Sequence, residues 1–110
     1  MTNATPSIQR LLLARSADGE EWPVLIKVGA PMPSDIAPWS CMVEVDRLFS
    51  PAKPIYGEDS WQAMQLAQEF AAAMLEQFQA RGGTLFWPRE ESASELQAFQ
   101  ARDLLPRLRA

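Results

Sequence analysis

A long stretch of helical periodicity, from Ser60 to Arg81, limits the folds open to this chain. At 1.5 Å per residue such a helix would be about 33 Å long, and the glycines that follow it can adopt the left-handed conformation that ends a helix. Its apolar side needs a partner surface, which the rest of the chain must supply. That side is expected to consist of Met64, Ala67, Ala71, Met74, Leu75 and Phe78, widened by Leu66 and Phe70.

Segments typical of β-strands surround this helix. The apolar stretch IQRLLLAR (8–15) precedes Asp18-Gly19, a pair suited to a tight reversal of the chain. The stretch EWPVLIKV (21–28) follows, and one of its faces would carry Trp22, Val24, Ile26 and Val28. In WSCMVEVD (39–46) the alternation is clearest, and the inward side would carry Trp39, Cys41, Val43 and Val45. The stretch TLFWP (84–88) is expected to return as a short strand.

Proline-rich segments separate these elements. Both GAPMPSDIAP (29–38) and FSPAKPIYG (49–57) are expected to be connections, because prolines disfavour the interior of a sheet. Downstream, Ser92 and Glu95 have the spacing of a capping box. The segment 92–105 is therefore expected to form a short amphipathic helix.

Together these elements predict an α+β fold, in which an antiparallel meander of three or four strands packs on one long helix, with a short C-terminal helix at an edge. A chain of 110 residues fits one domain, here 1–110, with a core at about 8–88 and a helical segment at about 92–105. The consecutive alanines at positions 71–73 would let the helix approach the strands closely.

The charge and the ligand-forming residues restrict the possible partners and cofactors. A net charge of −4 disfavours nonspecific binding to nucleic acid and suits a basic protein partner. With one cysteine and no histidine, the chain can form no internal disulfide and no thiolate zinc site of its own, and no cofactor or metal is expected. The start of the sequence has no basic leader and no spanning segment, so a cytoplasmic location away from the membrane is expected.

The stretch YGEDSWQAMQLAQEF (56–70) allows two interpretations of Ser60. A serine nucleophile needs a base, yet histidine is absent, and neither Lys27 nor Lys53 is placed near it by the sequence. The glycine spacing of a nucleophile elbow is also missing. As a helix cap, by contrast, Asp59 or Ser60 needs only a free backbone N–H, and Asp59 with Gln62 has the spacing of a capping box. The cap interpretation is favoured.

The stretch PIYGEDSWQAMQLAQEF resembles the signature of a family of small bacterial proteins of unknown function. In that signature a glycine, an Asp-Ser pair and a Gln-Ala pair open a long helix, matched here by Gly57, Asp59, Ser60, Gln62 and Ala63. The upstream stretches VLIKVGAP and WSCMVEV are similar to the family's strands, so the resemblance covers about residues 8–80. It implies the α+β fold and an accessory role in binding or neutralising a partner, with no activity to transfer.

Several other residues are candidates for a functional site. The acid pairs at 20–21, 58–59 and 90–91 are expected to be solvated, and Cys41 to be a buried core residue. Trp61 in the first helical turn either packs over the sheet edge or contacts a partner. A partner surface at this end of the helix would comprise Trp61, Gln62, Gln65 and Glu58.

Two classes of function follow, with a third possibility inside the first. The first is a noncatalytic protein-binding domain, in particular an immunity-type protein that neutralises a bacterial toxin through an acidic surface bearing a tryptophan. A basic toxin is the candidate partner of such a surface. Self-association as a homodimer, through the helix or an edge strand, also fits a binding role. The second class is a small enzyme or ligand-binding domain that uses carboxylates, for which Asp59 and Glu44 are the candidate acids.

Overall fold

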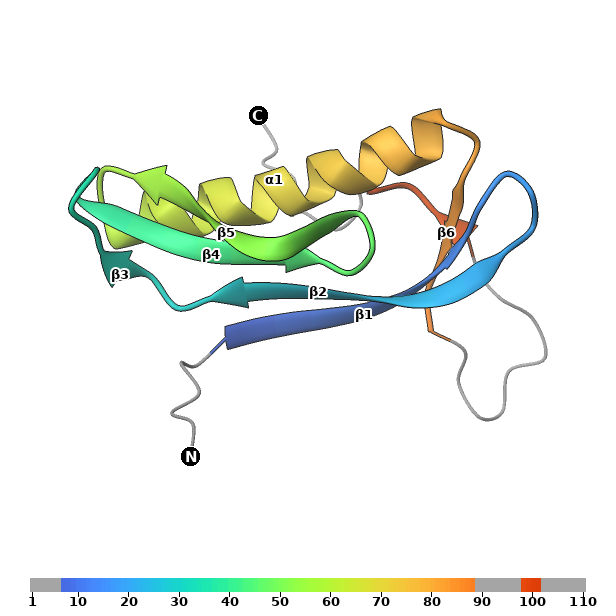
Figure 1. The fold of residues 1–110 in the computed structure, drawn as a ribbon, viewed down its shortest axis with the longest axis horizontal. Coiled ribbons are helices and arrows are strands. Elements are labelled where there is room, and N and C mark those ends of the chain that lie inside the picture. The colour runs from blue at the N-terminus through green and yellow to red at the C-terminus, as the bar shows by residue number, and fades with distance from the viewer. Residues whose placement is uncertain (1–6, 89–97, 102–110) are drawn as a thin grey trace, which may run out of the picture.

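The computed structural model describes residues 7–88 and 98–101, and shows an antiparallel sheet packed against one helix (Figure 1). The predicted α+β class is therefore confirmed. The helix α1 spans Ser60–Ala80. The strands are β1 (Ser7–Arg15), β2 (Glu21–Gly29), β3 (Met32–Pro33), β4 (Trp39–Val45), β5 (Phe49–Gly57), β6 (Thr84–Phe86) and β7 (Ala98–Phe99).

The sheet is built outward from β4. One edge of β4 pairs with β5, and the other edge pairs with β2 and β3 in succession. Beyond β2 the order continues through β1 and β6 to β7, and every described pairing is antiparallel. The seven strands of the described residues exceed the three or four predicted from the sequence.

The helix packs mainly on β4 and β5, as the ribbon shows (Figure 1). Alternation along the strands decides which side chains it covers, and the inward residues predicted for β2 and β4 do lie on the helix side. On α1 the contact is made largely by small residues, because the helix approaches the sheet closely. Leu66, predicted to widen the apolar side, is 36% exposed instead. The buried helix residues are Ala63, Ala67, Ala71, Ala72, Leu75 and Phe78.

Two of the predicted connections contain strands. The segment 49–57 forms β5, although it contains Pro51 and Pro54. Among the described residues β5 pairs only with β4, and an edge strand tolerates proline because one of its sides makes no ladder hydrogen bonds. In the same way the short strand β3 lies inside the segment 29–38. The prediction that both segments are connections was wrong for this reason.

The predicted C-terminal helix is wrong where the structure describes it. Ala98 and Phe99 form β7, which pairs with β6. The ring of Phe99 stacks on Trp87 with centroids 3.9 Å apart, and Gln79 of α1 hydrogen-bonds to the Phe99 carbonyl. These contacts hold the segment extended. The remainder of the predicted helix, 92–97 and 102–105, lies outside the described residues.

Candidate functional site

The start of α1 is fastened by a reciprocal set of hydrogen bonds. Asp59 is the N-cap residue, and its Oδ1 accepts from the Gln62 backbone N–H at 2.7 Å. The Gln62 side chain reaches back, and its Oε1 accepts from the Glu58 backbone N–H, also at 2.7 Å. The Gln62 amide, which the helix start would leave unpaired, and the amide of Glu58, just before the cap, are thus both satisfied. Gly57 is needed here because a Cβ atom at this position would lie 2.5 Å from the Ala63 nitrogen.

Ser60 is the first residue of the helix and is half-buried. No side chain in the described part of the chain hydrogen-bonds to its hydroxyl, so no base is placed to take its proton. The neighbouring carboxylate of Asp59 is engaged by the backbone amide of Gln62. The local geometry is that of a helix cap.

The two candidate acids of the enzyme alternative lie far apart. Gly57, just before Asp59, pairs with Trp39 at the start of β4, whereas Glu44 lies five residues further along that strand. Five residues of strand span about 17 Å. The side chain of Glu44 also lies on the sheet side opposite the buried Val43 and Val45, where it accepts a hydrogen bond from the Ser50 hydroxyl at 2.9 Å. The fold does not bring these carboxylates into one site.

The predicted partner residues do lie together on the surface at the start of α1. Trp61 is 80% exposed, which makes it the most exposed of the large hydrophobic residues that the structure describes. Glu58, Gln62 and Gln65 are also exposed. The Gln62 oxygen is occupied by the helix cap, so this residue contributes to the structure of the helix start as well as to the surface.

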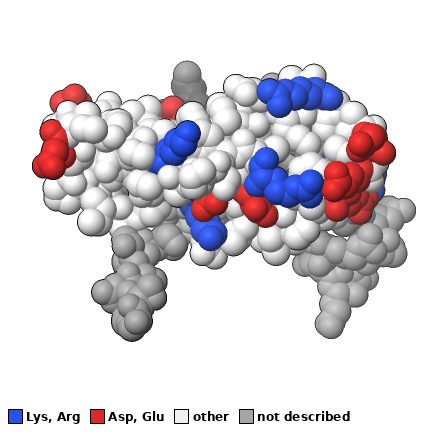
Figure 2. All heavy atoms as spheres, viewed as in Figure 1, with Lys and Arg blue, Asp and Glu red and all other residues white. Residues whose placement is uncertain are grey.

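The same end of the molecule is acidic. On the face shown in Figure 2, the end where β3 lies and α1 begins displays acidic side chains and no lysine or arginine. The basic side chains visible on this face lie nearer its middle and its other end.

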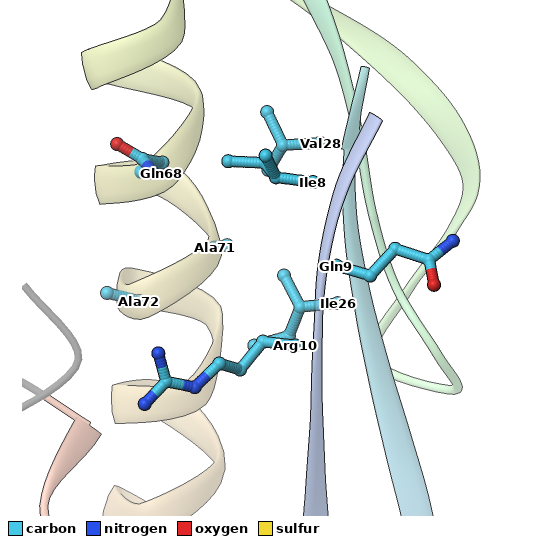
Figure 3. A pocket seen from close by; sticks show the side chains of 8 residues that line it. All are labelled: Ile8, Gln9, Arg10, Ile26, Val28, Gln68, Ala71 and Ala72. Carbon is cyan, nitrogen blue, oxygen red and sulfur yellow. The ribbon is translucent and has the colours of Figure 1, made fainter. Parts of the chain in front are cut away.

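A second feature, not predicted from the sequence, is an open apolar groove between α1 and β1 (Figure 3). Its volume is about 240 Å³, which is small for a drug-sized ligand. The groove exists because α1 lies over β4 and β5 and leaves the helix side of β1 partly uncovered. It is lined by Ile8, Arg10, Ile26, Val28, Gln68, Ala71 and Ala72, while Gln9 points away from the helix at its rim.

The remaining candidates do not form a site. Cys41 is fully buried beneath the helix, and burial raises the pKa of its thiol, so a reactive thiolate is disfavoured. Within residues 7–88 and 98–101, no group of three histidine, cysteine or acidic side chains is arranged to hold a metal ion. In the same residues, α1 is not apolar enough to cross a membrane.

The fold and the surface geometry define an α+β domain in which one helix covers part of an antiparallel sheet. A family model described as a domain of unknown function (DUF6968) matches residues 8–98, and the chain belongs to this family. The match includes the helix start and the groove, so both features lie within the family's domain. No curated protein and no solved structure matches the chain.

Proposed function

We propose that this chain is a noncatalytic protein-binding domain whose contact surface is centred on Trp61. The observation that supports the proposal is the 80% exposure of the Trp61 side chain at the start of a helix fixed by Asp59 and Gln62. Tryptophan buries a large area on binding and is enriched at the centres of protein interfaces. A rigid helix end holds it in place without a further loss of chain entropy.

The finer proposal is an immunity-type protein of a bacterial cytoplasm that neutralises a basic toxin. The net charge of −4 and the acidic end of the molecule around the helix start support a basic partner. The separation of Asp59 from Glu44 supports a role without catalysis, since the two candidate acids occupy different sites.

The test is a pull-down from the native lysate with the wild-type chain, the Trp61→Ala variant and a matched control, Met42→Ala. Met42 is 44% exposed on β4, on the sheet face away from α1. We expect one protein to be retained by the wild type and Met42→Ala and lost with Trp61→Ala. Removal of a central tryptophan costs about 2 kcal/mol or more, which is about a thirtyfold loss of affinity.

The biological part of the proposal is tested with the neighbouring gene. Expression of that gene should be toxic alone and harmless when this chain is present, and Trp61→Ala should restore toxicity. A harmless neighbour together with no retained protein would refute the immunity role.

The enzyme alternative predicts a different result at Asp59. If the chain only binds, Asp59→Asn should leave partner retention intact and lower thermal stability slightly, because asparagine also caps a helix. If the wild type turns over a substrate and Asp59→Asn abolishes that turnover at an unchanged melting temperature, the enzyme alternative is favoured instead.

A further inference from the structure

One edge of β1 is left open by the sheet. On one side β1 pairs with β2 along its whole length, but on the other side it pairs with β6 only at Leu13–Arg15. Among the residues that the structure describes, no strand pairs with the rest of that edge, 7–12. An open edge presents unpaired backbone groups to which another chain can add as a strand.

The outward backbone groups of this edge belong to odd-numbered residues. At the β1–β2 hairpin the Ser16 N–H donates to the Glu20 carbonyl at 2.8 Å, so Ser16 directs its backbone groups toward β2. Backbone groups of alternate residues point to the same side of a strand, so even-numbered residues face β2. Gln9 and Leu11 therefore direct their N–H and C=O groups away from the sheet.

The groove runs beside this open edge and offers an apolar pocket. Ile26 and Val28 are buried at its base, and Ala71 and Ala72 form the helix wall. Ile8 on the strand side is 46% exposed, although it faces the helix. An apolar side chain from an added strand would cover this surface and remove it from water.

Arg10 is the one charged residue among the described residues that line the groove, and its guanidinium lies at the end of the groove beyond Ala72 (Figure 3). The group also stacks over the ring of Trp87, at 5.1 Å from the ring centroid. Since the described residues of the lining include no carboxylate to pair with it, this part of the groove favours an anionic group at this end.

The chain already shows how this side of α1 holds an extended segment. The Gln79 side chain donates to the Phe99 carbonyl at 3.0 Å and accepts from the Ala101 N–H at 2.9 Å. Gln68 lies on the same side of the helix, because eleven residues are close to three full turns. It is one of the residues that line the groove beside β1.

We propose that the groove between α1 and β1 binds an extended segment of a partner protein, which adds as a strand to the open edge of β1. An apolar side chain of that segment enters the pocket beside Ile8, and an acidic side chain on the same face meets Arg10. Gln68 binds its backbone from the helix side. A second copy of this chain is disfavoured as the occupant: Arg10 lies near the middle of the open edge, so two antiparallel β1 strands would bring two guanidinium groups together.

The probe is a short fluorescent synthetic peptide of serine and threonine, with two valines and one glutamate at alternate positions so that all three share a face. Anisotropy titration of the purified chain should show saturable binding. Amide NMR signals of Gln9 and Leu11 should shift on addition of the peptide. The same peptide with an N-methyl group on every backbone amide, which can donate to β1 from neither edge, should bind at least tenfold more weakly.

Variants of the chain test the side-chain contacts. Arg10→Glu should reverse the preference between the glutamate peptide and one with lysine in its place. Gln68→Ala should weaken binding by about three- to tenfold, the effect of one lost hydrogen bond. Met42→Ala on the other sheet face should bind as the wild type does. Melting curves of all variants verify folding, and Arg10→Gln, which should only lose the preference for glutamate, replaces Arg10→Glu if the latter is unfolded.

Equal binding of the N-methylated peptide, an absence of binding at millimolar peptide, or signal shifts confined to other strands would overturn the proposal. So would sedimentation showing a dimer of this chain, together with amide signals of Gln9 and Leu11 that shift as the dimer forms. The inference rests on the proposed binding function but fails separately from it. If Arg10→Glu keeps the toxin-neutralising activity while Trp61→Ala loses it, the groove proposal is refuted and the binding function stands.

Discussion

Gly57 lies where the end of β5 meets the first turn of α1, and no larger residue fits there. A Cβ atom would lie 2.5 Å from the nitrogen of Ala63 and 2.7 Å from its Cα, both backbone atoms that cannot move independently. We expect Gly57→Ala to destabilise the fold by about 1–3 kcal/mol, the cost of overpacking. The matched control is Gly29→Ala, whose Cβ would meet Met42 at an ordinary 3.5 Å. Urea unfolding of both variants measures the effect, and equal stabilities would show that β5 and α1 can separate freely.

Hydrogen bonds within the turn at residues 16–20 lower the pKa of the Asp18 carboxylate. The Ser16 hydroxyl donates to it, and the Glu20 backbone N–H lies 3.3 Å from its Oδ1; these contacts lower the pKa of Asp18 below its ordinary value. Because the folded pKa is the lower one, the stability from these contacts is present above the unfolded pKa and is lost as pH falls through the folded pKa. We expect Ser16→Ala to raise the pKa of Asp18. A titration followed by NMR of the Asp18 carboxyl carbon measures this pKa, with the urea-unfolded chain as reference. The same pKa in the variant and the wild type would contradict the prediction.

At the scale of elements, the approach of α1 to the sheet is not equally tight along the helix. Ala67 is fully buried, whereas Ala71, one turn later, borders the open groove. We expect Ala67→Leu to destabilise the protein by about 1–3 kcal/mol through overpacking. Ala71→Leu should cost less, because its larger side chain can extend into the groove. Thermal melting of the two variants provides the comparison, and an equal loss of stability would mean that the groove is closed in solution.

Two of the strands that the sequence predicted, at 21–28 and 39–46, were recognised by the alternation of their side chains. Val43 and Val45 on β4 are buried as their period of two requires, and the helix follows from its own apolar side. The segment that became β5 carries Pro51 and Pro54, and its role depends on a neighbour, β4, that supplies the pairing. Its sequence alone gives no sign of that neighbour. For the same reason Phe99 became part of a strand, because Trp87 and Gln79 hold it.

Trp61 at the helix start and the groove between α1 and β1 differ in how far the sequence predicts them. The place of Trp61 in the first turn follows from local chemistry, since it is set by the cap at Asp59. Whether its ring packs over the sheet edge or faces solvent was left open by the sequence, and the structure shows it 80% exposed. The groove, by contrast, depends on which strands the helix covers. Ile8 and Ala72 are far apart in the sequence, and each is apolar enough to belong to an ordinary core. Only the position of α1 over β4 and β5 leaves the space between them open.

For the molecule as a whole, Cys41 reports on global unfolding. It is the only cysteine of the chain, so any labelling can be assigned without ambiguity. The residue is fully buried in β4, which has β2 on one side, β5 on the other and α1 above it. Burial also raises the pKa of the thiol, so the reactive thiolate is disfavoured in the folded state. No local opening of a single edge would expose it, and labelling should require the helix and the sheet to separate.

We therefore expect the native chain to react with a thiol reagent at least about a thousandfold more slowly than the urea-unfolded chain, given a stability of about 5 kcal/mol or more for a domain of this size. Because the folded pKa of Cys41 is the raised one, the protein should also lose stability as pH rises above the pKa of the unfolded thiol. Cys41→Ser serves as the control for reagent specificity. Ala67→Leu should speed labelling by the factor that its loss of stability predicts. Rapid labelling of the native wild type would show that Cys41 is reached without unfolding of the whole domain. A rate that Ala67→Leu leaves unchanged would show that the opening does not separate α1 from the sheet.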